Sequence, residues 1–173
     1  KPAGQSISGK HIGVVGFGDI GRQTVKRLSG FDVTVTVYDP AMKGQTGFEF
    51  AKFRDYPSGL AELDYLIFTC SLNKHNRHML GAEQIGKLKP GCGVINVARG
   101  PLIDETALIA GLESGPVGSA ALDVFELEPL PMSSPLRVLP QCVFGSHNSS
   151  NTREAVVRAS TDALTKIAGF LHV

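Results

Sequence analysis

Several side chains in the C-terminal half of this 173-residue chain have the chemistry of an anion-binding and proton-transfer site. Arg99 follows a strand-like apolar run, a small group of acids follows another between Asp123 and Glu128, and His147 follows the last short apolar run. A histidine exchanges protons near neutral pH, and a neighbouring carboxylate would hold its ring and favour its protonated form. An arginine offers a two-pronged cation to a carboxylate. Together these residues suit a reaction that moves a hydroxyl proton on a carboxylate-bearing substrate.

Each of these residues has a simpler interpretation when it is taken alone. Arg99 can be a surface salt-bridge partner, and His147 can bond to the backbone near Asn151 at the start of a helix. For Glu126 and Glu128 individually, we favour solvated loop charges. The presence of all these residues together favours an anion-binding and proton-transfer site.

A glycine-rich stretch near the N-terminus adds a second chemical signal. Gly16-Phe17-Gly18-Asp19-Ile20-Gly21 ends a short apolar run and leads into a helical pattern over 22–28. The first glycine permits a tight turn, the second lets the backbone approach a pyrophosphate, and the third lets the helix pack close to the strand. The helix start then offers free N–H groups and a positive dipole end to phosphates.

Asp39 strengthens this dinucleotide signal. It closes a β-branched run over 33–38, eighteen residues after Gly21. An acidic residue there accepts hydrogen bonds from the adenosine ribose hydroxyls and repels a 2′-phosphate. We therefore predict that the cofactor is NAD, with Lys43 as the nearest cation that would soften the preference.

The elements that must position these residues alternate along the chain. Strand-like runs are predicted at 11–15, 33–38, 48–53, 64–70, 93–98, 118–124 and 142–145. Helices are predicted at 22–28, 57–63, 81–88 and 104–112, the last of them capped by Asp104. This alternation predicts an α/β fold with a doubly wound parallel sheet of the Rossmann type and helices on both faces.

A final helix is predicted from a capping box formed by Asn151 and Glu154. Its apolar residues follow one helical stripe and are Val156, Ala159, Ala163, Leu164, Ile167 and Phe170. Such a stripe is typical of a helix that packs against a core.

Ligands of such sheets bind beyond the carboxyl ends of the strands. The residues that follow the predicted strands are therefore the site candidates. They are the glycine loop, Asp39, Cys70, Ser71, Arg99, the segment from Asp123 to Glu128, and His147.

Length and composition indicate one domain over 10–173, after a polar lead-in over 1–9. The net charge of +1 gives no electrostatic case for nucleic acid or an acidic membrane surface. No apolar run reaches the length of a membrane span, and the start of the chain lacks the apolar core of a signal peptide.

The cysteines and histidines give no metal-ligand spacing. Cys70, Cys92 and Cys142 are expected to be free thiols of a reducing compartment, so we predict a cytoplasmic protein. His75 and His78 are interpreted as solvated surface histidines, since no third ligand lies near them.

Three motifs together resemble the D-isomer-specific 2-hydroxyacid dehydrogenases. The segment 95–105 resembles the arginine signature of that family, and 121–131 resembles its acidic signature. The glycine loop resembles its cofactor fingerprint, and the resemblance extends from about Gly9 to the last helix.

The resemblance implies a role for each matching position. Arg99 would bind the substrate carboxylate and carbonyl oxygen, His147 would be the acid/base, and Glu128 would pair with His147. Asp123 would meet the nicotinamide carboxamide. The other implied contacts with NAD are Asp19 and Ile20 at the pyrophosphate, and Cys70, Val97 and Ala98 at the nicotinamide.

The chain departs from the family pattern next to the predicted acid/base. Ser146 stands where the family has proline, and Ser149 stands where a small residue or glycine is common. The loop 71–75 also lacks the usual proline and threonine. We therefore expect a less rigid approach to His147.

Family members are about twice this length, with a substrate domain built from segments on both sides of the cofactor domain. The chain thus resembles a cofactor domain cut out at its hinges. The leading hypothesis is the NAD-binding domain of an enzyme that acts on 2-hydroxy or 2-oxo acids. We expect the isolated domain to be inactive and homodimeric. Two alternatives stay open: an NAD(H)-sensing interaction module and a remnant binding module without turnover.

Overall fold

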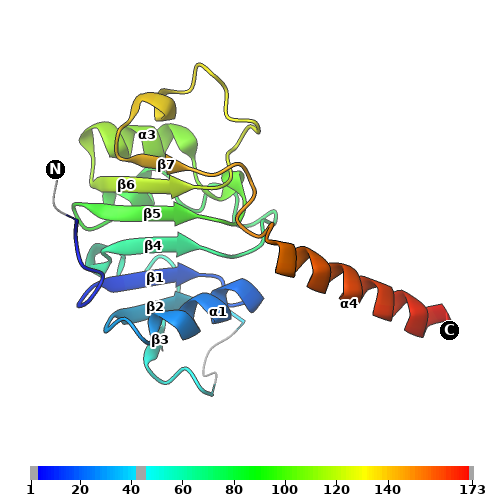
Figure 1. The fold of residues 1–173 in the computed structure, drawn as a ribbon. Coiled ribbons are helices and arrows are strands. Elements are labelled where there is room, and N and C mark those ends of the chain that lie inside the picture. Colours follow the sequence, from blue (N-terminus) through cyan, green and yellow to red (C-terminus); the bar gives the residue numbers. More distant parts are fainter. Residues whose placement is uncertain (1–3, 42–45, 172–173) are drawn as a thin grey trace.

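The structure is a computed structural model that describes residues 4–41 and 46–171. Seven parallel strands form one sheet in the order β3-β2-β1-β4-β5-β6-β7 (Figure 1). The strands are β1 (His11–Val15), β2 (Thr34–Tyr38), β3 (Ala51–Phe53), β4 (Tyr65–Phe68), β5 (Cys92–Asn96), β6 (Val117–Leu122) and β7 (Cys142–Phe144). The order reverses between β1 and β4, so the predicted doubly wound α/β fold is confirmed.

Helices lie on both faces of the sheet. The helices are α1 (Asp19–Leu28), α2 (Ala82–Gly86), α3 (Glu105–Ser114) and α4 (Arg153–Leu171), with 3-10 turns at Leu60–Glu62, Gly100–Leu102 and Pro135–Val138. On one face, Val25 and Leu28 of α1 pack over apolar residues of β1 and β2. On the other, α2 and α3 bury residues that include Ile85, Leu108 and Leu112 against the rest of the sheet.

The face that α1 covers is bare over β4–β7 in the described part of the chain (Figure 1). The strand register places Ile67, Ile95, Ala121 and Val143 side by side in one row, which continues from the buried Val14. The first three of the row are partly exposed, and Val143 is 69% exposed. The expectation of helices on both faces therefore holds for only part of this face.

Helix α4 differs most from its prediction. It projects away from the sheet (Figure 1), and none of its residues is buried. Ile167 is 55% exposed and Phe170 is 83% exposed. Its apolar stripe is real, but the described residues supply nothing for it to pack against. Its cap is also one residue later than predicted, because the Thr152 hydroxyl, not the Asn151 side chain, accepts the Ala155 N–H at 3.1 Å.

Two predicted elements near β3 are shorter than expected. Of the strand at 48–53, only the last three residues pair with β2. The ring of Phe48 instead packs edge-on against Phe17 at 4.9 Å between centroids. The helix at 57–63 is a single 3-10 turn, since Gly59 has a φ of +77°, which no α-helix accommodates. Asp104 does cap α3, where its side chain accepts the Ala107 N–H.

Candidate active site

The glycine loop connects β1 to α1 at the carboxyl edge of the sheet. Gly16 has a φ of +96°, and a Cβ there would lie 2.6 Å from the backbone of Cys70. A Cβ on Gly21 would lie 2.1 Å from the Gly16 carbonyl oxygen. Gly18 has open space beside it. The first and third glycines are therefore required by the turn and by the packing of α1, while the second leaves the start of the helix accessible.

Asp39 is joined to this loop by its carboxylate. One carboxylate oxygen accepts the backbone N–H of Phe17 at 2.8 Å, and the other accepts the N–H of Ala41 at 2.9 Å. The Phe17 side chain itself is fully buried in the core. Phe17 can therefore contact a ligand only through its backbone. The sequence alone did not show whether its side chain or its backbone would face the site.

A cavity of about 530 Å³ lies between the glycine loop and Asp39. Cys70 and Ser71 line it, as predicted for residues after β4. Arg54 and His75 also line it, and neither had been selected as a site residue. Burial raises the pKa of the Cys70 thiol to about 11, so this cysteine is a neutral wall residue and not a nucleophile.

Arg99 lies at the end of β5 on a backbone that Asn96 organises. Asn96 is 1% exposed. Its amide donates to the Arg99 carbonyl at 2.9 Å, and its side-chain oxygen accepts the Ala98 N–H at 3.1 Å. Its backbone carbonyl accepts the N–H of Asp123 on the neighbouring strand. A single polar residue at the end of an apolar strand was the sequence feature that could have indicated that Asn96 organises this backbone. Val97 is partly exposed, and Ala98 is buried.

His147 and Glu128 form the contact that the sequence suggested. The ring Nδ1 lies 2.7 Å from a carboxylate oxygen of Glu128, whose other oxygen accepts the Phe125 N–H at 3.0 Å. The hydrogen bond from His147 is the main cause that lowers the pKa of Glu128, and the charge of Arg99 contributes. Glu128 is therefore a carboxylate at neutral pH, and Arg99 is close enough to act on it electrostatically. The two side chains are 49% and 36% exposed.

Asp123 fixes the backbone on both sides of His147. Its carbonyl accepts the His147 N–H at 2.7 Å. Its carboxylate accepts the N–H groups of Asn148 and Ser149, both at 3.1 Å. Burial opposes ionisation of Asp123, but these hydrogen bonds outweigh it and lower its pKa. His147 has a φ of +58°, an uncommon conformation that these bonds maintain. These hydrogen bonds hold the backbone that follows Ser146.

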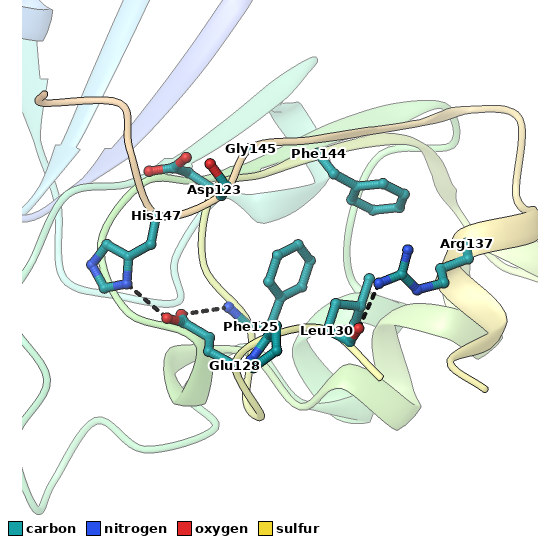
Figure 2. A pocket seen from close by; sticks show the side chains of 10 residues that line it. Asp123, Phe125, Glu128, Leu130, Arg137, Phe144, Gly145 and His147 are labelled. Carbon is teal, nitrogen blue, oxygen red and sulfur yellow. Dashed lines mark hydrogen bonds and ion pairs between the residues drawn. The ribbon is translucent and has the colours of Figure 1, made fainter. Parts of the chain in front are cut away.

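A cavity of about 250 Å³ opens beside the His147–Glu128 pair. Figure 2 shows the rings of Phe125 and Phe144 on its apolar side, with Arg137 at the far end from His147. The Arg137 guanidinium donates to the carbonyls of Leu130 and Pro131. The acidic loop and the edge strand β7 thus form one wall around the pair.

Two predictions about polar loop residues are corrected. His78 is not simply solvated, because its Nε2 lies 3.0 Å from a carboxylate oxygen of Glu126. Glu126 is not a solvated loop charge either, since its side chain is only 25% exposed. No local pattern indicates this contact, because its partners lie 48 residues apart.

Within residues 4–41 and 46–171, no group of three His, Cys, Asp or Glu residues is arranged to hold a metal ion. The three cysteines are free thiols, as predicted. None of the helices in the same ranges combines the length and the apolar character that crossing a membrane requires.

The family model of the D-isomer specific 2-hydroxyacid dehydrogenase NAD-binding domain matches residues 1–149. The chain belongs to this family. The three sequence motifs and the strand order of the sheet agree with this assignment. The chain is therefore an NAD(P)-binding domain of the 2-hydroxyacid dehydrogenases.

The relatives that this dehydrogenase domain matches are about twice its length. Glyoxylate reductase of Thermofilum pendens is 38% identical over 170 residues, which are 97% of this chain and 50% of that protein. The NAD complex of formate dehydrogenase from Staphylococcus aureus has a TM-score of 0.84 at 27% identity, covering 96% of this chain and 50% of that one.

A third similar protein carries the other cofactor. It is the NADPH complex of a D-isomer specific 2-hydroxyacid dehydrogenase from Xanthobacter autotrophicus Py2, with a TM-score of 0.74 at 34% identity. The match covers 80% of this chain and 44% of that one. The chain thus spans about half the length of the relatives it matches.

Proposed function

We propose that this chain is the cofactor domain of an NAD-dependent oxidoreductase that interconverts 2-oxo and 2-hydroxy acids. The observation that carries the proposal is the 2.7 Å contact between His147 and Glu128, with Arg99 close enough to influence the same carboxylate. A module that only sensed NAD(H) would not require a histidine–carboxylate pair at the carboxyl edge of the sheet. This pair therefore favours the enzyme over the sensor and the remnant module.

The glycine loop and Asp39 suit a dinucleotide. The start of α1 is free of Cβ atoms at Gly18, which is the space that a pyrophosphate requires. Asp39 lines the cavity where an adenosine would lie, and Asp19 and Ile20 stand exposed at the first turn of the helix. The nicotinamide end would rest near Val97, Ala98 and the other residues that follow β4, β5 and β6. NAD(H), when bound, supplies or accepts the hydride.

The chain's own residues then handle the substrate anion and the proton. Arg99 binds the carboxylate of the 2-oxo acid and draws electron density towards the carbonyl oxygen. His147 donates a proton to that oxygen as it becomes a hydroxyl, and takes the proton back in the oxidation direction. Glu128 holds the ring through Nδ1, which leaves Nε2 for the substrate.

The test of this function is turnover by a full-length parent protein that contains this chain. It should consume NADH when a small 2-oxo acid such as glyoxylate, hydroxypyruvate or pyruvate is added. Loss of that activity on replacement of His147, with NADH still bound, would support the assignment. A parent that binds NADH but leaves every 2-oxo acid unchanged would contradict it.

We expect this domain to bind NADH at least about tenfold more tightly than NADPH, which corresponds to about 1.4 kcal/mol. A 2′-phosphate would meet the Asp39 carboxylate, whereas the ribose hydroxyls would donate to it. Arg54 lines the same cavity, but its guanidinium is paired with Glu62 at 2.7 Å. Lys43 lies outside the described residues.

Fluorescence titration of NADH and NADPH measures this preference directly. Asp39→Asn should narrow the difference, while Glu113→Gln on the exposed side of α3 serves as a charge-matched control. Equal affinity for the two cofactors in the unmodified domain would refute the role of Asp39. The Xanthobacter complex with NADPH shows that similar proteins make either choice.

We also expect a two-fold homodimer, even for this domain alone. Large apolar side chains are exposed near the β7 edge, with Met132 at 85%, Val138 at 80% and Val143 at 69%. Such a patch favours burial against a second copy. Light scattering at high micromolar concentration should give twice the monomer mass, and Val143→Lys should shift it towards the monomer. A monomeric unmodified domain would count against this proposal.

A further inference from the structure

Glu126 lies where three loops meet at the carboxyl edge of the sheet. One carboxylate oxygen accepts the backbone N–H of Glu105 at 2.9 Å. The other lies 3.0 Å from the His78 ring Nε2 and 3.4 Å from the Arg77 guanidinium. These partners belong to the loop after β4 and to the start of α3, whereas Glu126 follows β6. One side chain therefore ties together three segments that the strand order brings side by side.

The contact between Glu126 and Glu105 is reciprocal. The Glu105 carboxylate accepts the backbone N–H of Glu126, while the Glu126 carboxylate accepts the N–H of Glu105. Glu105 is the first residue of α3, so the Glu126 carboxylate also lies at the positive end of that helix. The loop after β6 is thereby held next to α3 through both the side chain and the backbone N–H of Glu126.

The loops that carry Arg99 and Glu128 touch at their backbones in the same place. A Cβ on Gly100 would lie 1.9 Å from the carbonyl group of Phe125. The Pro101 carbonyl accepts the His78 N–H at 2.7 Å, which adds the loop after β4 to this layer. A shift of the 125–126 backbone would therefore disturb the surroundings of Arg99 as well.

The connection from Glu126 to the acid/base is short. The N–H of the preceding residue, Phe125, donates to one carboxylate oxygen of Glu128 at 3.0 Å. The other oxygen of Glu128 holds the His147 ring at 2.7 Å. Because Glu128 and His147 are half-exposed, packing alone does not fix them. Their geometry depends on the backbone that bears Phe125 and Glu126.

We propose that Glu126 is a positioning residue, which sets the place of Glu128, and through it the orientation of His147, by tying the loop after β6 to Glu105 and His78. This inference rests on the proposed function for what Glu128 and His147 do. It adds a residue that touches neither substrate nor cofactor.

The experiment compares three variants of the full-length parent. Glu126→Ala removes every side-chain contact and should lower kcat about tenfold or more, up to about 100-fold, because small misplacements of catalytic groups are costly. NADH affinity should stay unchanged. Glu126→Gln keeps an oxygen for the Glu105 N–H and should restore most of kcat. Glu113→Gln, an exposed change elsewhere on α3, should behave as the unmodified protein.

A spectroscopic readout separates this inference from the proposed function. The His147 Nδ1 proton, bonded to Glu128, should give a low-field NMR resonance in the unmodified protein, in Glu126→Gln and in Glu113→Gln. The resonance should broaden or vanish in Glu126→Ala. If Glu126→Ala does not fold, Glu126→Asp, which keeps the charge and shortens the reach, carries the same expectation.

Two results would overturn the inference. One is a Glu126→Ala protein that retains both the resonance and the unmodified kcat. The other is an equal loss in Glu126→Ala and Glu126→Gln that extends to NADH affinity, which would indicate a general structural role. If the parent reduces no 2-oxo acid at all, the proposed function fails, but the resonance still decides whether Glu126 positions the pair.

Discussion

Replacement of His147 by alanine in the full-length parent should lower kcat about 10²- to 10⁴-fold, the range that general acid–base catalysis contributes. The affinity for NADH should change little, because the glycine loop and Asp39, which we propose bind the dinucleotide, lie on the other half of the sheet. The backbone of His147 is held by Asp123, so removal of the ring should leave the loop in place. Stopped-flow or steady-state assays with a 2-oxo acid, together with an NADH titration, measure both quantities.

Glu128→Gln is the matched variant for this test. It keeps the shape of the side chain and an oxygen for the Nδ1–H group, but removes the negative charge. Glu128 has a pKa below its ordinary value, mainly because of its hydrogen bond with His147, so the unmodified side chain is a carboxylate in the neutral range. Glu128→Gln should therefore weaken the 2.7 Å contact that orients the ring and lower kcat, but by less than His147→Ala. Near-normal turnover by His147→Ala would require the catalytic assignment to be abandoned.

The 173-residue chain by itself should bind NADH and yet reduce 2-oxo acids with a kcat/KM at least about 10³-fold below that of the full-length parent, since productive positioning supplies a contribution of this size or larger. Hydride transfer requires that water be excluded and that the substrate be held against the nicotinamide. His147 is 49% exposed, and Arg99 is exposed at the end of β5. Arg99, which we propose binds the substrate carboxylate, is thus open to water in the described part of the chain.

The comparison requires both proteins at equal NADH occupancy, because a difference in cofactor binding alone would imitate the effect. Absorbance of NADH follows turnover, and fluorescence confirms that the short chain is loaded. Comparable turnover by the two proteins would show that no closing domain is needed.

Features that depend only on neighbours in the chain could be predicted from the sequence. Gly16 needs a positive φ and Gly21 needs contact with Gly16, so a short motif is enough to specify the turn and the start of α1. The Asp104 cap of α3 was predictable because its acceptor and the N–H that it accepts are only three residues apart in the chain. Apolar, β-branched runs gave the strands, and their alternation with helices gave the sheet. Arg99, His147 and the group of acids from Asp123 to Glu128 were candidates because they follow strands, and the family resemblance then selected Glu128 from that group.

The tertiary structure decided which of these residues meet and what surrounds them. Glu128 and His147 are 19 residues apart, and His78 and Glu126 are 48 apart, so no local pattern records either contact. Each depends on the strand order, which brings the loops after β4, β5 and β6 to one edge. The exposed apolar stripe of α4 is a second feature that the sequence pattern alone did not predict correctly. An amphipathic pattern states that a helix face should be buried, but only the arrangement of the rest of the molecule supplies the surface that buries it.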